Sequence, residues 1–326
     1  MGTKEKDWVE HLFVATTHDY IMIFTRSGQC YWLKVWEIPQ GGRHSRGKPI
    51  VNLVNILPGD EVAAVVPVRE FSEDRFLLFS TRLGLVKKTP LSAYGHIRSV
   101  GLNAINIREG DELIGVKVTS GDDEVILGTR LGMAIRFHES DARPMGRATS
   151  GVRGINLGKN DYVVGMVVLA RPDTTLLVVT EGGMGKRTDV EAYRFQQRGG
   201  KGVINIKTSD KTGKVVAIKS VIDEDELMVI TRNGVVNRQR VEEIRTIGRA
   251  TQGVRLVNLD PGDRVMDVAR VVMENGEDGV EILPGMDGEE ELAEGVPAGT
   301  ADSHLDDERS PEAEDAEVGG EEGAGS

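Results

Sequence analysis

One short turn motif recurs five times along this chain, and its regular spacing restricts the fold more than any other feature. The motif is Thr-x-x-Gly, and its closing glycines lie 56, 48, 51 and 51 residues apart, in residues 25–28, 81–84, 129–132, 180–183 and 231–234. Two further anchors keep the same phase. GRATSGVR at 146–153 recurs as GRATQGVR at 248–255, and PGDE at 58–61 recurs as EGDE at 109–112 and PGDR at 261–264. Self-similarity of this kind is typical of chains built from one structural unit that stacks on its neighbours.

Each repeat is predicted to hold four short strands. In the last copy these are residues 215–222, 227–232, 235–241 and 253–259, which are rich in β-branched and apolar residues. Asn233-Gly234, between the second and third of them, is a strong hairpin signal. Only 5% of residues are aromatic while 40 are glycines, which fits short strands joined by tight turns. Four strands per ~50 residues predict an all-β propeller of about five four-stranded blades.

Charge divides the chain into a body and a tail. Residues 274–326 hold 19 acidic residues against one basic residue, Arg309, and few apolar ones, so we expect a disordered acidic tail. The remainder is mildly basic, with 39 Lys and Arg against 33 Asp and Glu. The predicted organisation is a lead-in over residues 1–7, a bladed domain over 8–273 and the tail over 274–326.

The cellular compartment is predicted from what the sequence does not contain. A single cysteine, Cys30, excludes an internal disulfide and favours a reducing compartment. The opening segment, MGTKEKDWVE, has no apolar stretch of the kind found in secretory signals, and no apolar run approaches the ~18 residues that cross a bilayer. We therefore expect a cytoplasmic protein that does not associate with membranes.

Basic residues recur in phase with the blades. The third strand of each repeat alternates in character, so every other side chain is expected to face solvent, and the loop after it adds more Lys and Arg. On a ring of blades, equivalent positions would form a continuous belt. Such a belt suits duplex DNA, because backbone binding needs spaced cations and no base-reading helix. The residues predicted to contact DNA are Lys34, Arg43, Arg46, Lys48, Lys87, Lys88, Arg98, Arg136, Arg143, Arg147, Lys186, Arg187, Arg194, Arg198, Lys201, Arg238, Arg240, Arg245 and Arg249.

These motifs resemble the C-terminal domain of DNA gyrase A, the gyrase component that cleaves DNA. The resemblance rests on the Thr-Arg-x-Gly turns, RGKPIVNL at 46–53, EGDELIGV at 109–116 and MGRATSGVRGI at 145–155, and it extends over residues 8–273. It implies a six-bladed β-pinwheel, in which neighbouring blades exchange an outer strand and the rim binds and wraps duplex DNA. It also implies partners, namely the remainder of gyrase A and the ATPase component, gyrase B. That complex uses ATP and Mg²⁺ to introduce negative supercoils, whereas this chain alone is expected to need no cofactor.

Two departures from that family matter. The family carries a heptapeptide box, Gln-Arg-Arg-Gly-Gly-Lys-Gly or close to it, in its first blade, and Met1 falls just after the place of that blade. The region with the DNA-cleaving tyrosine has no counterpart in this sequence. A near copy of the box occurs in the fourth repeat. It acts either as a box or only as the ordinary anchor of its blade, because GGKGV fills the position of TSGVR and TQGVR. Its residues are Gln196, Gln197, Arg198, Gly199, Gly200, Lys201 and Gly202.

No enzymatic chemistry is predicted for this chain alone. Tyr94 and Tyr193 both lie ten residues after a turn glycine, which is a packing position, and EGGMGKRT at 181–188 lacks the spacing of a phosphate-binding loop. Six scattered histidines and one cysteine give no metal-ligand spacing, so we expect neither a catalytic residue nor a metal site. Two other interpretations stay open. One is the corresponding domain of the DNA-cleaving component of topoisomerase IV, and the other is a propeller that serves as a protein-interaction scaffold.

Overall fold

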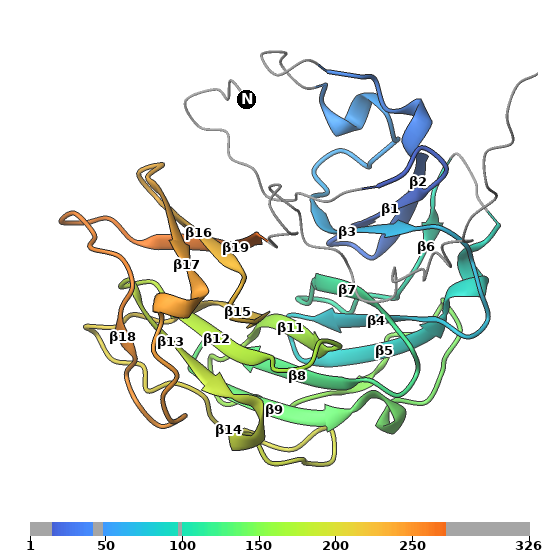
Figure 1. The fold of residues 1–326 in the computed structure, drawn as a ribbon. Helices are drawn as coiled ribbons and strands as arrows, with labels where there is room; N and C mark the ends of the chain where they lie inside the picture. Colours follow the sequence, from blue (N-terminus) through green and yellow to red (C-terminus); the bar gives the residue numbers. More distant parts are fainter. Residues whose placement is uncertain (1–14, 42–47, 97–99, 272–326) are drawn as a thin grey trace, which may run out of the picture. The chain divides into compact units, whose positions relative to one another are not determined.

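The computed structural model describes residues 15–41, 48–96 and 100–271. In these ranges all regular structure consists of strands and short 3-10 helices, so the all-β prediction is confirmed (Figure 1). No helix there is long and apolar enough to cross a membrane. The predicted lead-in over 1–7 and tail over 274–326 lie outside the described residues, as do three of the predicted contact residues, Arg43, Arg46 and Arg98.

Five antiparallel hairpins form the framework, one for each Thr-x-x-Gly turn. In four of the five turns the threonine hydroxyl accepts the N–H four residues on, as in Thr25 from Gln29 (3.2 Å), whereas the Thr180 hydroxyl donates to Met184 O (3.1 Å). The closing glycine has a positive φ, +88° at Gly28, which side chains with a Cβ rarely adopt. The hairpins, numbered as blades 1 to 5, are β1 (Tyr20–Thr25) with β2 (Gln29–Lys34), β4 (Phe76–Thr81) with β5 (Leu85–Pro90), β8 (Glu124–Thr129) with β9 (Met133–His138), β12 (Thr175–Thr180) with β13 (Met184–Asp189), and β16 (Glu226–Thr231) with β17 (Val236–Arg240).

The strand that follows each hairpin in sequence pairs with the hairpin's first strand. Each of these flanking strands also contacts its counterpart in the next blade, so the blades pack on one another in chain order. The flanking strands are β3 (Val62–Val68), β7 (Leu113–Thr119), β11 (Val163–Leu169), β15 (Val215–Val221) and β19 (Val265–Val271).

The second strand of a hairpin takes its outer neighbour from the following repeat. We call these two-residue neighbours exchange strands. Blades 1 to 4 therefore have four strands each, while the described part of blade 5 has three, in the order β17-β16-β19. The exchange strands are β6 (Leu102–Asn103) on β2, β10 (Val152–Arg153) on β5, β14 (Val203–Ile204) on β9 and β18 (Val254–Arg255) on β13.

The predicted number of blades is confirmed, but the grouping of strands within a repeat is wrong. Of the four strands predicted in the last repeat, only β16 and β17 belong to blade 5. The first and last, β15 and β18, complete blade 4. A local sequence pattern shows that a segment forms a strand but not which strand it pairs with. Every hairpin edge offers the same backbone donors and acceptors, so the pattern cannot distinguish between possible partners.

A short 3-10 helix follows the second hairpin strand in every blade and begins the loop that leads to the next sheet. These helices are η1 (Val35–Glu37), η3 (Leu91–Tyr94), η4 (Glu139–Asp141), η5 (Val190–Ala192) and η6 (Val241–Glu243), while η2 (Ile50–Asn52) lies later in the first loop.

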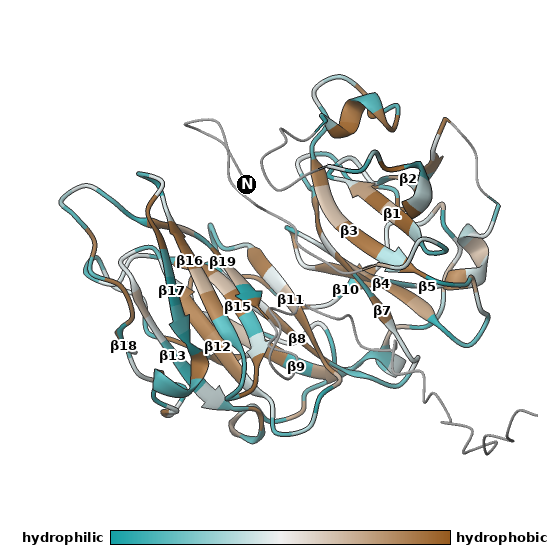
Figure 2. Ribbon diagram, turned by 45° about the horizontal axis from the view of Figure 1, so that its top comes forward, coloured by the Kyte–Doolittle hydropathy of each residue, from teal (hydrophilic) through white to brown (hydrophobic). Residues whose placement is uncertain are grey.

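The hydrophobic core lies between consecutive sheets. Phe24 of blade 1 meets Phe79 of blade 2 edge to face, with ring centroids 5.5 Å apart, and Tyr94 packs in the same cluster. Similar clusters join blades 2 and 3, 3 and 4, and 4 and 5. Figure 2 shows apolar residues along the strands of each sheet. Because each such side chain contributes ~1.5–3 kcal/mol on burial, a blade is stabilised mainly by its neighbours.

Charged side chains also join neighbouring blades. At the turns, the carboxylate of Glu112 pairs with Arg26 (3.5 Å) and Arg82 (2.9 Å), and Arg130 pairs with Glu181 (2.9 Å). Arg26 and Arg130 therefore join neighbouring blades through ion pairs. The Arg82–Glu112 pair lies within blade 2, and Arg82 reaches blade 3 by lying over the ring of Tyr162, 4.1 Å from its centroid.

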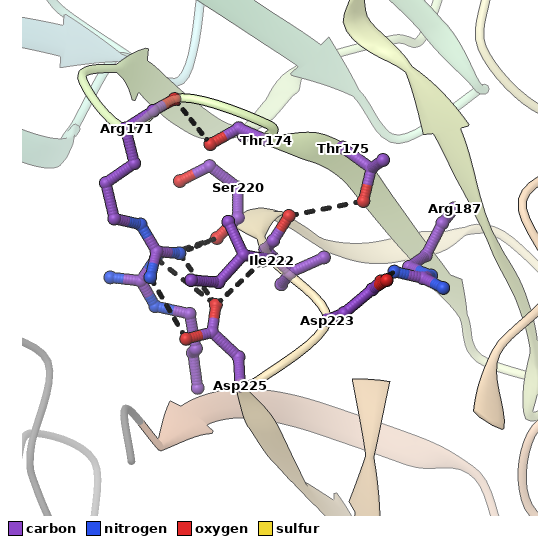
Figure 3. A network of polar contacts seen from close by, with 10 residues as sticks. Arg171, Thr174, Thr175, Arg187, Ser220, Ile222, Asp223 and Asp225 are labelled. Carbon is purple, nitrogen blue, oxygen red and sulfur yellow. Dashed lines mark hydrogen bonds and ion pairs between the residues drawn. The ribbon is translucent and has the colours of Figure 1, made fainter. Parts of the chain in front are cut away.

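A second polar network lies where blade 5 meets blade 4 (Figure 3). The Arg171 guanidinium donates to both oxygens of Asp225, at 3.0 and 2.6 Å, and Asp225 is 1% exposed. The same carboxylate accepts the N–H of Ile222 at 3.0 Å and lies 3.8 Å from Arg270 of β19. Asp225 thus ties the end of blade 4 to the start of blade 5.

Candidate nucleic-acid interface

Three bridging segments, residues 142–151, 193–202 and 244–253, carry the chain from a 3-10 helix to an exchange strand. Each runs along the second hairpin strand of the preceding blade. The equivalent N–H groups of Met145, Gln196 and Ile247 donate to carbonyls of that strand at 2.8, 3.0 and 2.9 Å. These bonds fix the path of the segments, so side chains at equivalent positions are held in the same way in three blades.

Arginine occupies one equivalent position in all three bridging segments, eleven residues after the turn glycine. Arg143, Arg194 and Arg245 stand there, and all three are exposed. No side-chain hydrogen bond or ion pair joins them to another described residue. Three guanidinium groups with unused donors at matching places can bind a repeating anion such as a nucleic-acid backbone.

A second equivalent position holds Arg147, Arg198 and Arg249, which are half-buried. Arg198 donates to the backbone carbonyls of Asp141 (2.7 Å) and Arg153 (3.2 Å), and Arg249 donates to that of Ile204 (2.9 Å). Arg198 and Arg249 therefore anchor the exchange strand of the preceding repeat, with some of their donors still facing solvent.

Five predicted contact residues are buried, which corrects the expected belt on the third strand. Alternation predicts a solvent-facing side, but a blade such as blade 2 packs against blade 1 through Phe79 and against blade 3 through Val86, so both of its faces are covered. Side chains that point to opposite faces of the third strand are therefore both buried. The residues are Lys87 (0% exposed), Lys88 (4%), Arg136 (4%), Lys186 (0%) and Arg187 (7%).

The buried arginines and Lys88 are satisfied within the protein. Arg136 makes an ion pair with Glu124 (2.6 Å) and donates to the carbonyls of Val190 (3.0 Å) and Tyr193 (3.2 Å). Arg187 pairs with Asp223 and donates to Ile244 O (2.8 Å), and Lys88 donates to Gly121 O (3.1 Å). These side chains hold bridging segments and turns in place, so they are not offered to a ligand.

Lys87 and Lys186 occupy the same position in blades 2 and 4, where no carboxylate of the described residues pairs with them. Lys87 donates to the carbonyls of Ala104 and Arg147, while Lys186 donates to those of Gly248 (2.8 Å) and Arg249 (2.9 Å). Burial lowers the pKa of Lys87 to about 7, and the positive charge of Arg147 acts in the same direction. Burial, with a smaller effect from Arg249, lowers the pKa of Lys186 to about 8.

The other predicted contact residues differ in exposure. Lys48, Lys201, Arg238 and Arg240 are exposed, and Lys34 is half-buried beside the rings of Tyr20 and Trp36. Arg238 pairs with Glu226, and Arg240 pairs with Glu242 at 3.1 Å. Both arginines lie on β17, whose outer side carries no strand among the described residues.

The box-like motif Gln196–Gly202 takes the path of an ordinary bridging segment. Its Gly199 N–H donates to Gly154 O at 2.6 Å, and Gly202 has a φ of +75°, like Gly151 (+81°) and Gly253 (+78°) at the equivalent position. The motif thus occupies the anchor position of its blade. Its Arg198 is held by backbone carbonyls, while Lys201 remains exposed.

Two further exposed arginines were missed. Arg153 and Arg255 end the exchange strands β10 and β18, next to the bridging segments. The signal was in the sequence, because both belong to the recurring Gly-Val-Arg of the second anchor.

The predicted packing role of the tyrosines is confirmed for Tyr94 and Tyr193, which are both 0% exposed. Their hydroxyls donate to Ala104 O (3.1 Å) and Asn205 Oδ1 (2.6 Å), and burial raises the pKa of each. Within the described ranges, no three His, Cys, Asp or Glu residues gather as a metal site would require.

Comparison with known families now identifies this architecture. A family model described as "DNA gyrase C-terminal domain, beta-propeller" matches the chain once per blade, at residues 19–69, 75–120, 123–170, 174–222 and 225–271. The chain belongs to the DNA gyrase C-terminal domain family.

Relatives and solved structures of this family agree with the match. DNA gyrase A of Neisseria gonorrhoeae is 39% identical over 85% of this chain and 35% of its own length. That of Escherichia coli is 42% identical over 89% of this chain and 33% of its own length, so the chain spans about a third of these relatives. The C-terminal domain of DNA topoisomerase IV superposes with a TM-score of 0.76 at 27% identity, covering 83% of this chain and 84% of that one.

Proposed function

We propose that this gyrase C-terminal domain binds duplex DNA without sequence preference and bends it along its bridging segments, as part of DNA gyrase A. The observation that carries the proposal is the equivalent, exposed placement of Arg143, Arg194 and Arg245. Family membership and the naming of the curated relatives support it.

The proposed contacts are made to phosphates. The described residues contain no α-helix that could enter the major groove, and their exposed cations recur from blade to blade. Spaced cations of this kind bind the DNA backbone and release its counterions. Because bending a short duplex costs several kcal/mol, contacts spread over several blades are needed to offset it.

The proposed setting is a larger, cytoplasmic enzyme. The remainder of gyrase A would supply DNA cleavage, and the ATPase component, gyrase B, would supply ATP and Mg²⁺ chemistry, so this chain alone would be no enzyme and would need no cofactor. The same role in topoisomerase IV is the second candidate, which the structural match to that enzyme's C-terminal domain favours. A protein-interaction scaffold is the alternative of another class.

A charge-matched pair of triple variants tests the proposal. Reversal of the bridging arginines, in Arg143→Glu, Arg194→Glu and Arg245→Glu together, is expected to weaken binding of a long duplex at least tenfold at low salt. The control triple is Lys159→Glu, Lys211→Glu and Arg232→Glu. It makes the same charge change at exposed positions on turns, away from the bridging segments. An equal loss of DNA affinity in both triple variants would show that only net charge matters. No loss of affinity in either variant would favour the protein-interaction scaffold.

A further inference from the structure

The outer edge of blades 1 to 4 is closed in one repeated way. The carbonyl of the turn glycine accepts two consecutive N–H groups that follow the exchange strand, as Gly28 O does from Ala104 (2.8 Å) and Ile105 (3.3 Å). The approach is so close that a Cβ at Gly28 would lie 2.4 Å from Ile105 O. Gly84, Gly132 and Gly183 accept the same pair of bonds from their own exchange segments.

Blade 5 has the same edge without its neighbour among the described residues. Val235 and Val236 stand where the other blades bind an exchange strand, and they are 50% and 51% exposed, whereas their counterparts Leu85 and Val86 are 9% and 0% exposed. Gly234 keeps the positive φ of +82°, yet a Cβ there would meet no described atom within 4 Å. The turn is thus shaped for a strand whose backbone would pass over Gly234.

The chain contains a fitting segment beyond the described residues. All four exchange segments begin with a positive-φ glycine followed by Val or Leu, and their fifth residue is a buried Ile or Val. Gly279-Val280-Glu281-Ile282-Leu283 has the same Gly-Val start and places another branched aliphatic residue, Leu283, fifth. The other Gly-Val pair of the tail, Gly295-Val296, is followed by Pro297, which lacks the N–H that a strand residue donates.

The segment can reach the edge. The last described strand, β19, ends at Val271, which pairs with Glu226, and Glu226 pairs in turn with Arg240 at the end of β17. An antiparallel partner of β17 enters from that same end. The path crosses three strand spacings, ~14 Å, and runs back ~13 Å along β17, while nine residues extend ~30 Å.

We propose that Gly279–Leu283 adds to β17 as the fourth strand of blade 5. By the register of the other blades, Val280 would lie opposite Val236 and Glu281 opposite Val235. Leu283 takes the place that Ile105, Ile155, Ile206 and Val257 fill in blades 1 to 4. Charge favours this occupant, since Glu277 and Asp278 precede the segment and Arg238 and Arg240 lie on β17. The tail's remaining acidic residues are then anchored at the edge of blade 5.

A disulfide trap in the full chain tests the register. Val236→Cys with Val280→Cys is expected to form an intramolecular disulfide under mild oxidation, because opposed strand residues have Cβ atoms ~4.5–5.5 Å apart. Val236→Cys with Val296→Cys is the matched control, and the native Cys30 is buried in both. Equal yields in the two variants would overturn the proposal. A disulfide-linked dimer would do the same and would identify a second copy as the occupant.

Hydrogen exchange gives an independent measurement that needs no cysteine. Val280→Pro is expected to raise the exchange rate of amides in residues 235–237 at least tenfold, whereas the matched Val296→Pro leaves them unchanged. Both substitutions lie outside the described blades, so the body keeps its fold in each. Identical exchange in both variants and the parent chain would show that β17 does not bind this segment.

Discussion

The Arg171 guanidinium binds both carboxylate oxygens of Asp225, at 3.0 and 2.6 Å, and Asp225 is almost fully buried. Arg171 lies before β12 and Asp225 just before β16, so one ion pair joins segments 54 residues apart. Arg171 lies outside the set of basic residues that recur in phase with the blades. Its position in the structure makes it part of the contact between blades.

Neutralising Asp225 should therefore destabilise the domain. Asp225→Asn removes the carboxylate that neutralises the partly buried Arg171 and that lies 3.8 Å from Arg270, and we expect a loss of about 3 kcal/mol in the free energy of unfolding. Urea denaturation measures the loss. Asp173→Asn is the control, because Asp173 is exposed with a φ of +54° that Asn also tolerates. Equal stability of the two variants would contradict the structural role.

Lys87 should make stability depend on pH. Its pKa is about 7 in the folded chain and ~10.4 when unfolded, so the unfolded state binds more protons between these values. The free energy of unfolding therefore gains a contribution that rises with pH through this window, by at most ~1.4 kcal/mol per pH unit. Below about pH 7 the contribution is flat at its lowest value.

The Lys87→Met variant isolates that contribution. Relative to it, the parent chain should gain stability between about pH 7 and pH 9, measured by urea denaturation in matched buffers. Lys186→Met should show the same sign with the rise beginning about one pH unit higher, since its pKa is about 8. Parallel pH profiles for parent and Lys87→Met would show that Lys87 keeps its charge on folding.

Binding of duplex DNA should depend strongly on salt. If five blades each neutralise one or two phosphates, the log–log slope of affinity against salt concentration is expected at roughly −4 to −9. Titrations of one duplex at several salt concentrations measure the slope, and a second duplex of unrelated sequence should give the same value. A slope near zero would exclude backbone contacts.

Shortening the acidic tail should tighten DNA binding. Residues 284–326 carry 15 acidic residues against Arg309, and a tethered polyanion competes with DNA for the same cations. A chain that ends at Leu283 keeps the segment proposed to pair with β17 and loses most of the charge. Its affinity should rise at low salt, and the gain should shrink as salt screens the tail. Unchanged affinity at low salt would leave the tail a solubilising role only.

The repeat predicted the number of blades because a turn such as Thr81–Gly84 is a local structure. The same information could not predict which sheet receives β18, because that choice depends on contacts more than 60 residues apart. The candidate DNA-binding residues were likewise predicted only in part. The bridging arginines were predicted as exposed, and Arg143, Arg194 and Arg245 are. Lys87 and Arg136 belong to the same recurring basic pattern in the sequence. They are buried because their strand is packed on both faces, which the sequence pattern does not reveal.

Strand exchange also sets the timing of folding during synthesis. β2 ends at Lys34, but its outer partner β6 begins at Leu102, so 67 residues must be translated before that edge can close. At ~5–20 residues per second, the delay is ~3–13 s for a single blade. During this delay the nascent chain has an unpaired strand edge, which could pair with another nascent chain. Slow codons within a repeat would prolong this exposure, whereas slow codons after an exchange strand would give the completed blade time to settle.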